Sequence, residues 1–303
     1  MPSKSTDNPH ENERFLITSL LAAIEAGEAI QKIYHTGFQV EYKADHSPLT
    51  LADKTAHDII VRHLMESGIP ILSEEGKAIS FQERKTWETL WIVDPLDGTK
   101  EFVKRNGEFT VNIALVKKGT PIMGVVYAPD RDLLYFAIQD LGAYKIADPE
   151  IIRESQDGME AGRITLKDML KNARKLPLLD QQERPYTIVG SRSHATPDLE
   201  KFVEDKRKAF GEVDFIPAGS SLKICLVAEG QAHIYPRLAP TMEWDTAAAQ
   251  AVVEASGATV VRYGTDEPLR YNKENLLNPF FVVSRKLEID SSNCLIDDHI
   301  DRN

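Results

Sequence analysis

The feature that most constrains this chain is an apolar run that ends in two acidic residues, Trp91-Ile-Val-Asp94-Pro-Leu-Asp97-Gly-Thr99. Short runs of this kind predict a buried strand, and the strand delivers both carboxylates to its own end. An aspartate followed by Pro-x-Asp-Gly is also typical of a type I turn. Because close like charges are unfavourable without a cation to compensate them, the pair favours a metal site over a plain turn.

Two further acidic pairs stand at similar places. Glu74 and Glu75 follow a short apolar run, and Glu243 and Asp245 precede an alanine-rich stretch, where Asp245 opens a helical pattern. A solvated loop for Glu74 and a helix cap for Asp245 are the alternatives. Hard oxygen ligands in this number suit Mg²⁺, which keeps waters and bridges to substrate phosphate. Gly98 and Thr99 can add backbone N–H groups that hold a phosphate.

Other classes of site lack their motifs. The chain has no H-E-x-x-H, C-x-x-C, P-loop, G-x-S-x-G or G-x-G-x-x-G pattern. The D-x-D-G-T motif of haloacid-dehalogenase phosphatases is one residue shorter than the motif here, so the second aspartate cannot take the same position. Two cysteines, Cys225 and Cys294, cannot build a disulfide scaffold and favour a reducing compartment.

Changes of pattern along the chain predict two lobes. A helix over Glu13–Tyr34, a helix capped by Thr50 with Asp53 in its first turn, and an antiparallel meander over 109–138 give an α+β lobe at 13–146. Strand–helix alternation predicts an α/β lobe at 186–285. The charged stretch 147–185 is interpreted as a surface insertion and lobe boundary, residues 1–12 as a frayed leader and 286–303 as a tail.

The charge balance argues against a nucleic-acid binder. The chain carries 36 Lys and Arg against 47 Asp and Glu, a net charge of −11, and so lacks a positive footprint. No apolar stretch approaches the ~20 residues that span a membrane, and the polar N-terminus lacks the core of a secretory signal. We expect a cytoplasmic protein, monomeric or homodimeric, without an integral membrane segment; peripheral contact with the inner face of the membrane is left open.

Taken together, the motifs resemble the inositol monophosphatase superfamily of Mg²⁺-dependent, lithium-sensitive phosphatases. The resemblance lies in the motif at Asp94–Thr99, in Trp244-Asp245-Thr-Ala-Ala-Ala and in Glu74-Glu75. Within the superfamily, Asp97-Gly-Thr-Lys100-Glu-Phe and Ala218-Gly-Ser-Ser-Leu-Lys223 look like the 3′(2′),5′-bisphosphate nucleotidases of the CysQ type. This resemblance implies a layered αβαβα sandwich, with α+β and α/β lobes and the metal site between them.

The resemblance also implies which residues form the site. Glu74, Asp94 and the Leu96 carbonyl would ligate a first Mg²⁺, and Asp94, Asp97 and Asp245 a second, with two or three ions per site. Thr99 and Asp53 would pair to orient and deprotonate the attacking water, and Glu74 is counted with them as catalytic. The phosphate would meet the metal ligands and the Gly98 and Thr99 N–H groups.

The substrate implied by the resemblance is adenosine 3′,5′-bisphosphate, a by-product of sulfate assimilation that would be cleaved to AMP and phosphate. Further substrate contacts are expected from Lys100, Ser220, Ser221 and Lys223, with Lys104, Arg105 and Arg237 as other cations for the second phosphate. Each of these cations is alternatively a solvated surface residue, and the Gly219-Ser-Ser turn a simple helix cap. Two other functions stay open: an inositol or sugar monophosphate phosphatase, and a non-catalytic regulator that binds metal or nucleotide.

Overall fold

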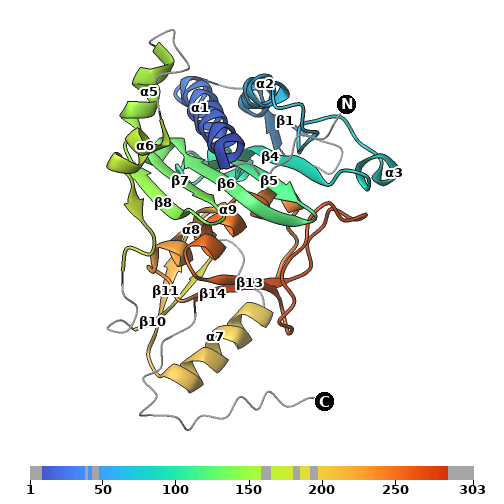
Figure 1. Ribbon diagram of the computed structural model, residues 1–303. Helices are drawn as coiled ribbons and strands as arrows, with labels where there is room; N and C mark the ends of the chain where they lie inside the picture. Colours follow the sequence, from blue (N-terminus) through green and yellow to red (C-terminus); the bar gives the residue numbers. More distant parts are fainter. Residues whose placement is uncertain are drawn as a thin grey trace.

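Helices and sheets alternate in five layers through the part of the chain that the computed structural model describes, residues 9–37, 40–42, 48–157, 165–179, 185–191 and 197–285. Two helices, α1 (Pro9–Tyr34) and α2 (Leu51–Met65), cover the outer face of a seven-stranded sheet (Figure 1). Two more, α8 (Leu222–Glu229) and α9 (Glu243–Ala255), lie between this sheet and a five-stranded one. The helix α7 (Pro197–Phe210) forms the last layer, which confirms the layered sandwich expected from the resemblance.

The seven-stranded sheet runs in the order β3-β4-β5-β6-β7-β8-β9. β3 and β4 pair in parallel, and each later pair is antiparallel, so the predicted meander is confirmed. The strands are β3 (Ile71–Ser73), β4 (Thr89–Asp97), β5 (Thr110–Lys117), β6 (Thr120–Ala128), β7 (Leu133–Ile138), β8 (Gly142–Ala147) and β9 (Arg174–Lys175). Two short helices lie between its strands, α3 (Phe81–Arg84) after β3 and α4 (Thr99–Val103) after β4, and a separate two-stranded sheet of β1 (Val40–Tyr42) and β2 (Pro48–Thr50) lies between α1 and α2 in the chain.

Alternation along β4 decides which way its carboxylate points. Trp91 and Val93 pack in the core under α1 and α2, whereas Leu90 and Ile92 pack in the core shared with α8 and α9. Successive side chains of a strand point to opposite faces, so Asp94 falls on the α8–α9 face with Leu90 and Ile92. Strands covered on both faces read as continuous apolar runs, which is why this run stands out in the sequence.

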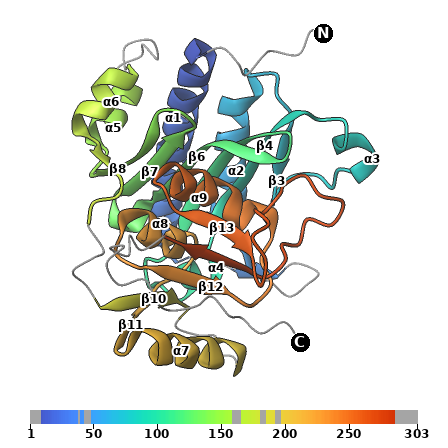
Figure 2. The same ribbon diagram turned by 60° about the horizontal axis from the view of Figure 1, so that its bottom comes forward.

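The five-stranded sheet has the order β11-β10-β12-β14-β13 and is mixed. β10 pairs in parallel with β11 and β12, and β14 pairs antiparallel with β12 and β13. Its strands are β10 (Tyr186–Gly190), β11 (Val213–Pro217), β12 (Ile234–Arg237), β13 (Thr259–Arg262) and β14 (Phe281–Ser284). Figure 2 shows α8 and α9 on one side of this sheet and α7 on the other.

The small residues of α9 allow a close approach between the two lobes. Ala247, Ala248 and Ala249 are buried, and α9 packs against β4, β5 and β6. A Cβ at Gly124 in β6 would collide with the Ala248 carbonyl, so glycine is required there. This close packing places the first turn of α9, which carries Asp245, near the end of β4.

Two expectations about the chain's organisation need correction. α1 begins at Pro9, so the last residues of the expected leader are helical. The stretch 147–185 holds α5 (Glu150–Asp157), α6 (Leu166–Asn172) and β9, and it adds Ile152 and Met169 to the first core with no exposed surface. Each short helix has few apolar anchors among many charges, too weak a pattern to detect. Thr196, residues 180–184 and the tail from 286 lie outside the described residues.

No helix in the described ranges is both long and apolar enough to cross a bilayer.

Candidate active site

Three carboxylates from separate parts of the chain meet beyond the end of β3 and along β4. Glu74 follows β3, Asp94 lies in β4, and Asp245 lies in the first turn of α9; one oxygen of each falls within 4.8 Å of the others. Asp94 is 1% exposed, and the other two side chains are half-buried. The fold therefore gathers three of the four acidic side chains expected to bind metal.

Burial and mutual repulsion raise the pKa values of two of these carboxylates. Burial, and then the charges of Glu74, Asp97 and Asp245, raise the pKa of Asp94 well above its ordinary value. Burial and the charges of Asp97 and Glu74 raise the pKa of Asp245 to about 8. A divalent cation between such oxygens removes the repulsion, and an all-carboxylate donor set suits Mg²⁺. The residues present therefore fit the metal that the resemblance implies.

Asp97 lies beside this trio, and the start of α8 holds it. Its Oδ2 accepts from the Ser221 N–H at 2.6 Å, and the Ser221 hydroxyl lies 2.8 Å from the same oxygen. The pairing of β4 with β5 shifts register between Asp94 and Asp97, which turns Asp97 towards α8. Asp97 thus contributes charge to the cluster from a position fixed by the second lobe.

Ser221, expected to contact substrate, has its hydroxyl engaged by the protein. The side chain is 3% exposed, and its Oγ lies 2.7 Å from the Asp245 carbonyl oxygen. Asn112 Nδ2 donates to it at 2.9 Å. The hydroxyl therefore joins Asp97 to the backbone of Asp245.

Asp53 and Thr99 form a hydrogen bond across two helix starts. Thr50 caps α2, and Asp53 Oδ2 accepts from the Thr50 N–H and hydroxyl, each at 2.7 Å. Thr99 opens α4 and donates from Oγ1 to Asp53 Oδ1 at 3.2 Å, with the Leu96 carbonyl oxygen at 3.3 Å. Asp53 is 2% exposed. The pair expected from the resemblance is therefore in contact.

Gly98 adopts the left-handed conformation that turns the chain from β4 into α4. Its φ is +90°, and a Cβ there would lie 3.1 Å from the Glu108 carbonyl oxygen and 3.3 Å from Ser220 Cβ. Any other residue would strain this turn and crowd both neighbours. The turn sets the Thr99 hydroxyl near Asp53 and Leu96.

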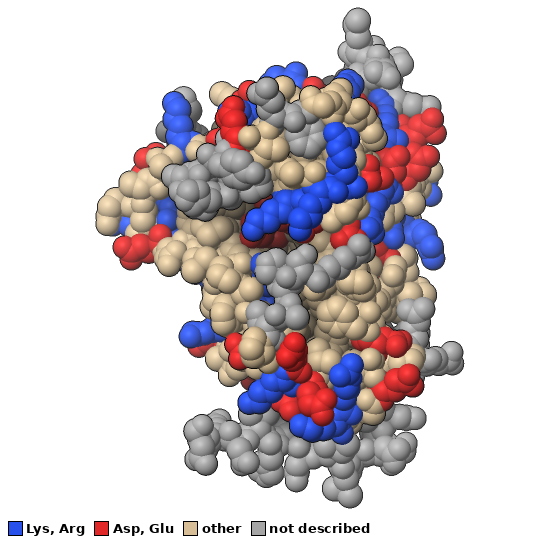
Figure 3. All heavy atoms as spheres, turned by 180° about the vertical axis from the view of Figure 1, so that it is seen from behind, with Lys and Arg blue, Asp and Glu red and all other residues tan. Residues whose placement is uncertain are grey.

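A cavity of about 300 Å³ opens beside the carboxylates and is lined by side chains of both charges. Asp97 and Asp245 line it together with cations, and on the face seen in Figure 3 basic and acidic side chains border a hollow. Of the expected substrate residues, the lining includes Gly98, Lys100, Ser220, Ser221, Lys223 and Arg237. Lys104 and Arg105 are not among the lining residues; the Arg105 guanidinium donates to the Tyr34 and Thr36 carbonyl oxygens instead.

Lys223 and Arg237 are the cations best placed to bind an anion. Lys223 is 6% exposed, its Nζ donates to the Ser220 carbonyl oxygen at 2.7 Å, and burial lowers its pKa to about 8. Arg237 donates from Nη2 to the Pro240 carbonyl oxygen at 2.8 Å, but its buried Nε has no hydrogen-bond partner within the described part of the chain. An anionic group in the cavity would satisfy that donor.

Sequence reasoning missed part of the site's surroundings. Tyr235 lines the cavity under Lys223, whose Nζ lies 5.7 Å from the ring centroid. A tyrosine in a strand carries no signal of that role. Arg84 and Lys273 contact residues that are distant in the sequence, and no sequence pattern indicates those contacts.

Comparison with known proteins gives the same family throughout. The model of the inositol monophosphatase family matches residues 11–292. The chain is 44% identical over 267 residues to the 3′(2′),5′-bisphosphate nucleotidase CysQ of Shigella flexneri, covering 86% of this chain and 96% of that protein. It is 42% identical to CysQ of Escherichia coli K12 over the same shares. The crystal structure of CysQ from Bacteroides thetaiotaomicron superposes with a TM-score of 0.81 at 50% identity, covering 91% of this chain and 98% of that one. By these matches, the chain belongs to the inositol monophosphatase family.

Proposed function

We propose that this chain is a Mg²⁺-dependent 3′(2′),5′-bisphosphate nucleotidase that hydrolyses adenosine 3′,5′-bisphosphate to AMP and phosphate. One observation carries the proposal: a single cavity is lined by the carboxylates Asp97 and Asp245, by the buried cation Lys223, and by Arg237, whose buried Nε has no hydrogen-bond partner among the described residues. Such a wall accommodates a ligand with two separate anionic groups: the carboxylates would bind one through metal ions, and the cations would bind the other directly. The relatives named as 3′(2′),5′-bisphosphate nucleotidases support this choice of substrate.

The metal would be held by the carboxylate cluster. Glu74, Asp94 and Asp245 would ligate Mg²⁺, with Asp97 and the Leu96 carbonyl as further ligands and two or three ions in the complete site. When bound, Mg²⁺ supplies positive charge to the phosphate oxygens and acidifies the attacking water. The chain has a net charge of −11, and without metal its clustered carboxylates would repel an anionic substrate. Bound cations would neutralise these carboxylates and allow the anion to bind.

Thr99 and Asp53 would orient the attacking water and take up its proton. Because the Thr99 hydroxyl donates to Asp53 Oδ1, its lone pairs are free to accept from water. Thr50 holds Asp53 Oδ2 with two donors, which fixes the orientation of the carboxylate. Asp53 is thereby oriented as the base of a water–Thr99–Asp53 relay, and no Ser or Cys nucleophile is required.

Recognition of the second phosphate would fall to Lys223 and Arg237, with Lys100 and Ser220 beside them on the cavity wall. The Gly98 and Thr99 N–H groups would meet the phosphate that is cleaved. Lys223 is rigidly placed by the Ser220 carbonyl and the Tyr235 ring, so little side-chain entropy is lost on binding.

A direct comparison of substrates tests the proposal. With saturating Mg²⁺ we expect a higher kcat/KM for adenosine 3′,5′-bisphosphate than for inositol 1-phosphate, and a chelator should abolish phosphate release. A higher value for the inositol ester would move the assignment to an inositol phosphatase. Binding of nucleotide and metal without phosphate release would indicate a non-catalytic regulator.

A further inference from the structure

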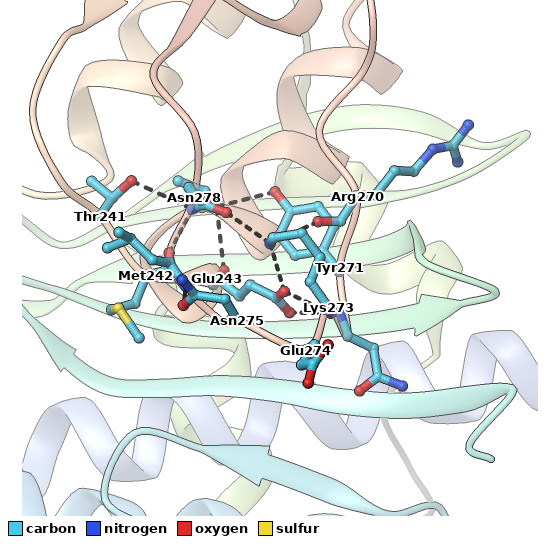
Figure 4. A network of polar contacts seen from close by, with 12 residues as sticks. Thr241, Met242, Glu243, Arg270, Tyr271, Lys273, Glu274, Asn275 and Asn278 are labelled. Carbon is cyan, nitrogen blue, oxygen red and sulfur yellow. Dashed lines mark hydrogen bonds and ion pairs between the residues drawn. The ribbon is translucent and has the colours of Figure 1, made fainter. Parts of the chain in front are cut away.

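The first turn of α9, which carries Asp245, is held by the loop that lies between β13 and β14. Glu243 is the first residue of α9 and has no exposed surface. Its Oε1 accepts from the Lys273 N–H at 3.0 Å and from Lys273 Nζ at 2.6 Å, and its Oε2 accepts from the Asn272 N–H at 2.6 Å (Figure 4). Both carboxylate oxygens therefore face donors from the loop.

The same loop returns to the start of α9 at two more points. The Glu243 N–H donates to the Leu276 carbonyl oxygen at 3.0 Å. Asn278 Nδ2 lies 2.7 Å from the Met242 carbonyl oxygen and 3.0 Å from Thr246 Oγ1. Figure 4 shows Asn278 beside Met242. Residues 272–278, which we call the α9 clamp, thus fix the N-cap and the first turn of the helix.

The position of Asp245 depends on that turn. Its Oδ2 accepts from the Met242 N–H at 2.9 Å, so the carboxylate is tied to the N-cap that the α9 clamp holds. Any shift of Met242 moves Asp245 relative to Asp94 and Glu74. Glu243 itself turns its carboxylate to the clamp, where it is fully paired.

The α9 clamp also contacts the segment of chain that follows Glu74. Arg84 ends α3, in the segment that follows Glu74, and is 3% exposed. Its guanidinium donates to Asn272 Oδ1 at 3.1 Å, to the Lys273 carbonyl oxygen at 2.6 Å and to the Glu274 carbonyl oxygen at 2.9 Å. Asn272 Nδ2 donates back to the Arg84 carbonyl oxygen at 2.7 Å. The loop therefore links the segment after Glu74 to the helix of Asp245.

We propose that Glu243 is a positioning residue of the metal site: through the α9 clamp and Arg84 it holds Asp245 in register with Glu74 and Asp94. This inference rests on the metal dependence in the proposed function. Partners that orient metal ligands typically contribute about 10- to 100-fold to metal affinity. Glutamine cannot replace Glu243, because its NH₂ group would face a backbone N–H or the Lys273 ammonium.

The test uses the full chain and measures metal binding directly. We expect Glu243→Gln to raise the Mg²⁺ dissociation constant, measured by isothermal titration calorimetry, about tenfold or more. The loss of kcat should be recovered at high Mg²⁺, with KM for the nucleotide unchanged at saturating metal. A merely structural role would move neither the dissociation constant nor the Mg²⁺ dependence of kcat.

Glu229→Gln is the matched control. Glu229 is 1% exposed, ends α8, and accepts from Lys145 Nζ at 2.8 Å and Gln231 Nε2 at 2.6 Å, so it is a second buried carboxylate with a lysine partner. Both variants should unfold at a lower temperature, but only Glu243→Gln should bind Mg²⁺ more weakly. Equal Mg²⁺ affinity in Glu243→Gln and the unmodified chain, or equal weakening in both variants, overturns the proposal.

A second variant covers the case in which Glu243→Gln does not fold. Arg84→Met removes the link to the α9 clamp from its far end and should weaken Mg²⁺ binding in the same direction; unchanged affinity contradicts the proposal. If the unmodified chain binds Mg²⁺ but releases no phosphate from the nucleotide, the proposed function fails, while the comparison of affinities still decides the role of Glu243.

Discussion

Thr99 Oγ1 donates to Asp53 Oδ1 at 3.2 Å, although 46 residues separate the two in the sequence. Each residue stands in the first turn of its own helix, and the two helix starts face one another. A hydroxyl bonded to a buried carboxylate can pass a proton to it. The contact is therefore the first place to test the mechanism.

Replacing Asp53 by Asn should lower kcat by about 10²- to 10⁴-fold, because the base of the relay is lost. Mg²⁺ affinity should stay close to that of the unmodified chain, since Asp53 is outside the cluster of Glu74, Asp94 and Asp245. Steady-state kinetics at saturating Mg²⁺ measure the effect. Asp168→Asn is the control: Asp168 occupies the same capping-box position on α6, where its partner is Thr165. An equal loss in both variants would contradict a catalytic role.

Asp94→Asn should change activity and stability in opposite directions. Turnover should fall by at least about 10³-fold, because a shared metal ligand and its charge are lost. In a chelator, however, the variant should melt at a higher temperature than the unmodified chain, because burial and three neighbouring carboxylates oppose the charge of Asp94. Thermal unfolding with and without Mg²⁺ checks this. Near-normal kcat at saturating Mg²⁺ would end the metal-ligand interpretation.

The metal-free protein should lose stability as pH rises through neutrality. The pKa of Asp245 is about 8 in the folded state against 3.8 as its ordinary value, and that of Asp94 is raised in the same direction. Between these values the unfolded chain has released protons that the folded chain still holds, so the free energy of unfolding falls with increasing pH. Denaturant titrations from pH 5 to pH 8 in chelator measure the slope. Mg²⁺ should remove it, and a slope unaffected by Mg²⁺ would argue against metal binding at these groups.

Lys223→Met should weaken use of the bisphosphate nucleotide selectively. We expect kcat/KM to fall about 10- to 100-fold, because a hydrogen bond from a charged group contributes about 1.5–3 kcal/mol. Adenosine 3′-monophosphate, which lacks the second phosphate, should be affected much less. Lys104→Met, at a lysine outside the cavity lining, serves as the control. A uniform loss on both substrates would remove Lys223 from recognition of the second phosphate.

The charge of Lys223 also predicts a pH dependence. Burial lowers its pKa to about 8, so the free enzyme loses this cation as pH rises above that value. KM for the bisphosphate should therefore increase above about pH 8, while KM for the 3′-monophosphate should not. A pH profile of KM on both substrates measures the difference, and parallel profiles would contradict it.

Much of the local structure could be predicted because it depends on neighbours in the chain. The continuous apolar run of Leu90–Val93 indicates a buried strand, and the capping box of Thr50 and Asp53 spans three residues, so both can be recognised in the sequence. The short helices α5 and α6 were not predicted because each is at most eight residues long, with only two or three apolar residues among charged ones. Arg105 and Arg237 looked equivalent in the sequence, yet one binds backbone carbonyls at the end of α1 and the other lines the cavity.

The sequence by itself determined that Asp94 ends an apolar strand, that Asp53 sits in the first turn of a helix, and that the acidic motifs resemble a metal-dependent phosphatase family. Only the tertiary structure decided that Asp245 meets Glu74 and Asp94, and that the α9 clamp and Arg84 hold it there. The physical reason is that periodicity and capping act over a few residues. The cluster depends instead on α9 packing closely against β6 at Gly124 and on partly buried hydrogen bonds between segments nearly 200 residues apart.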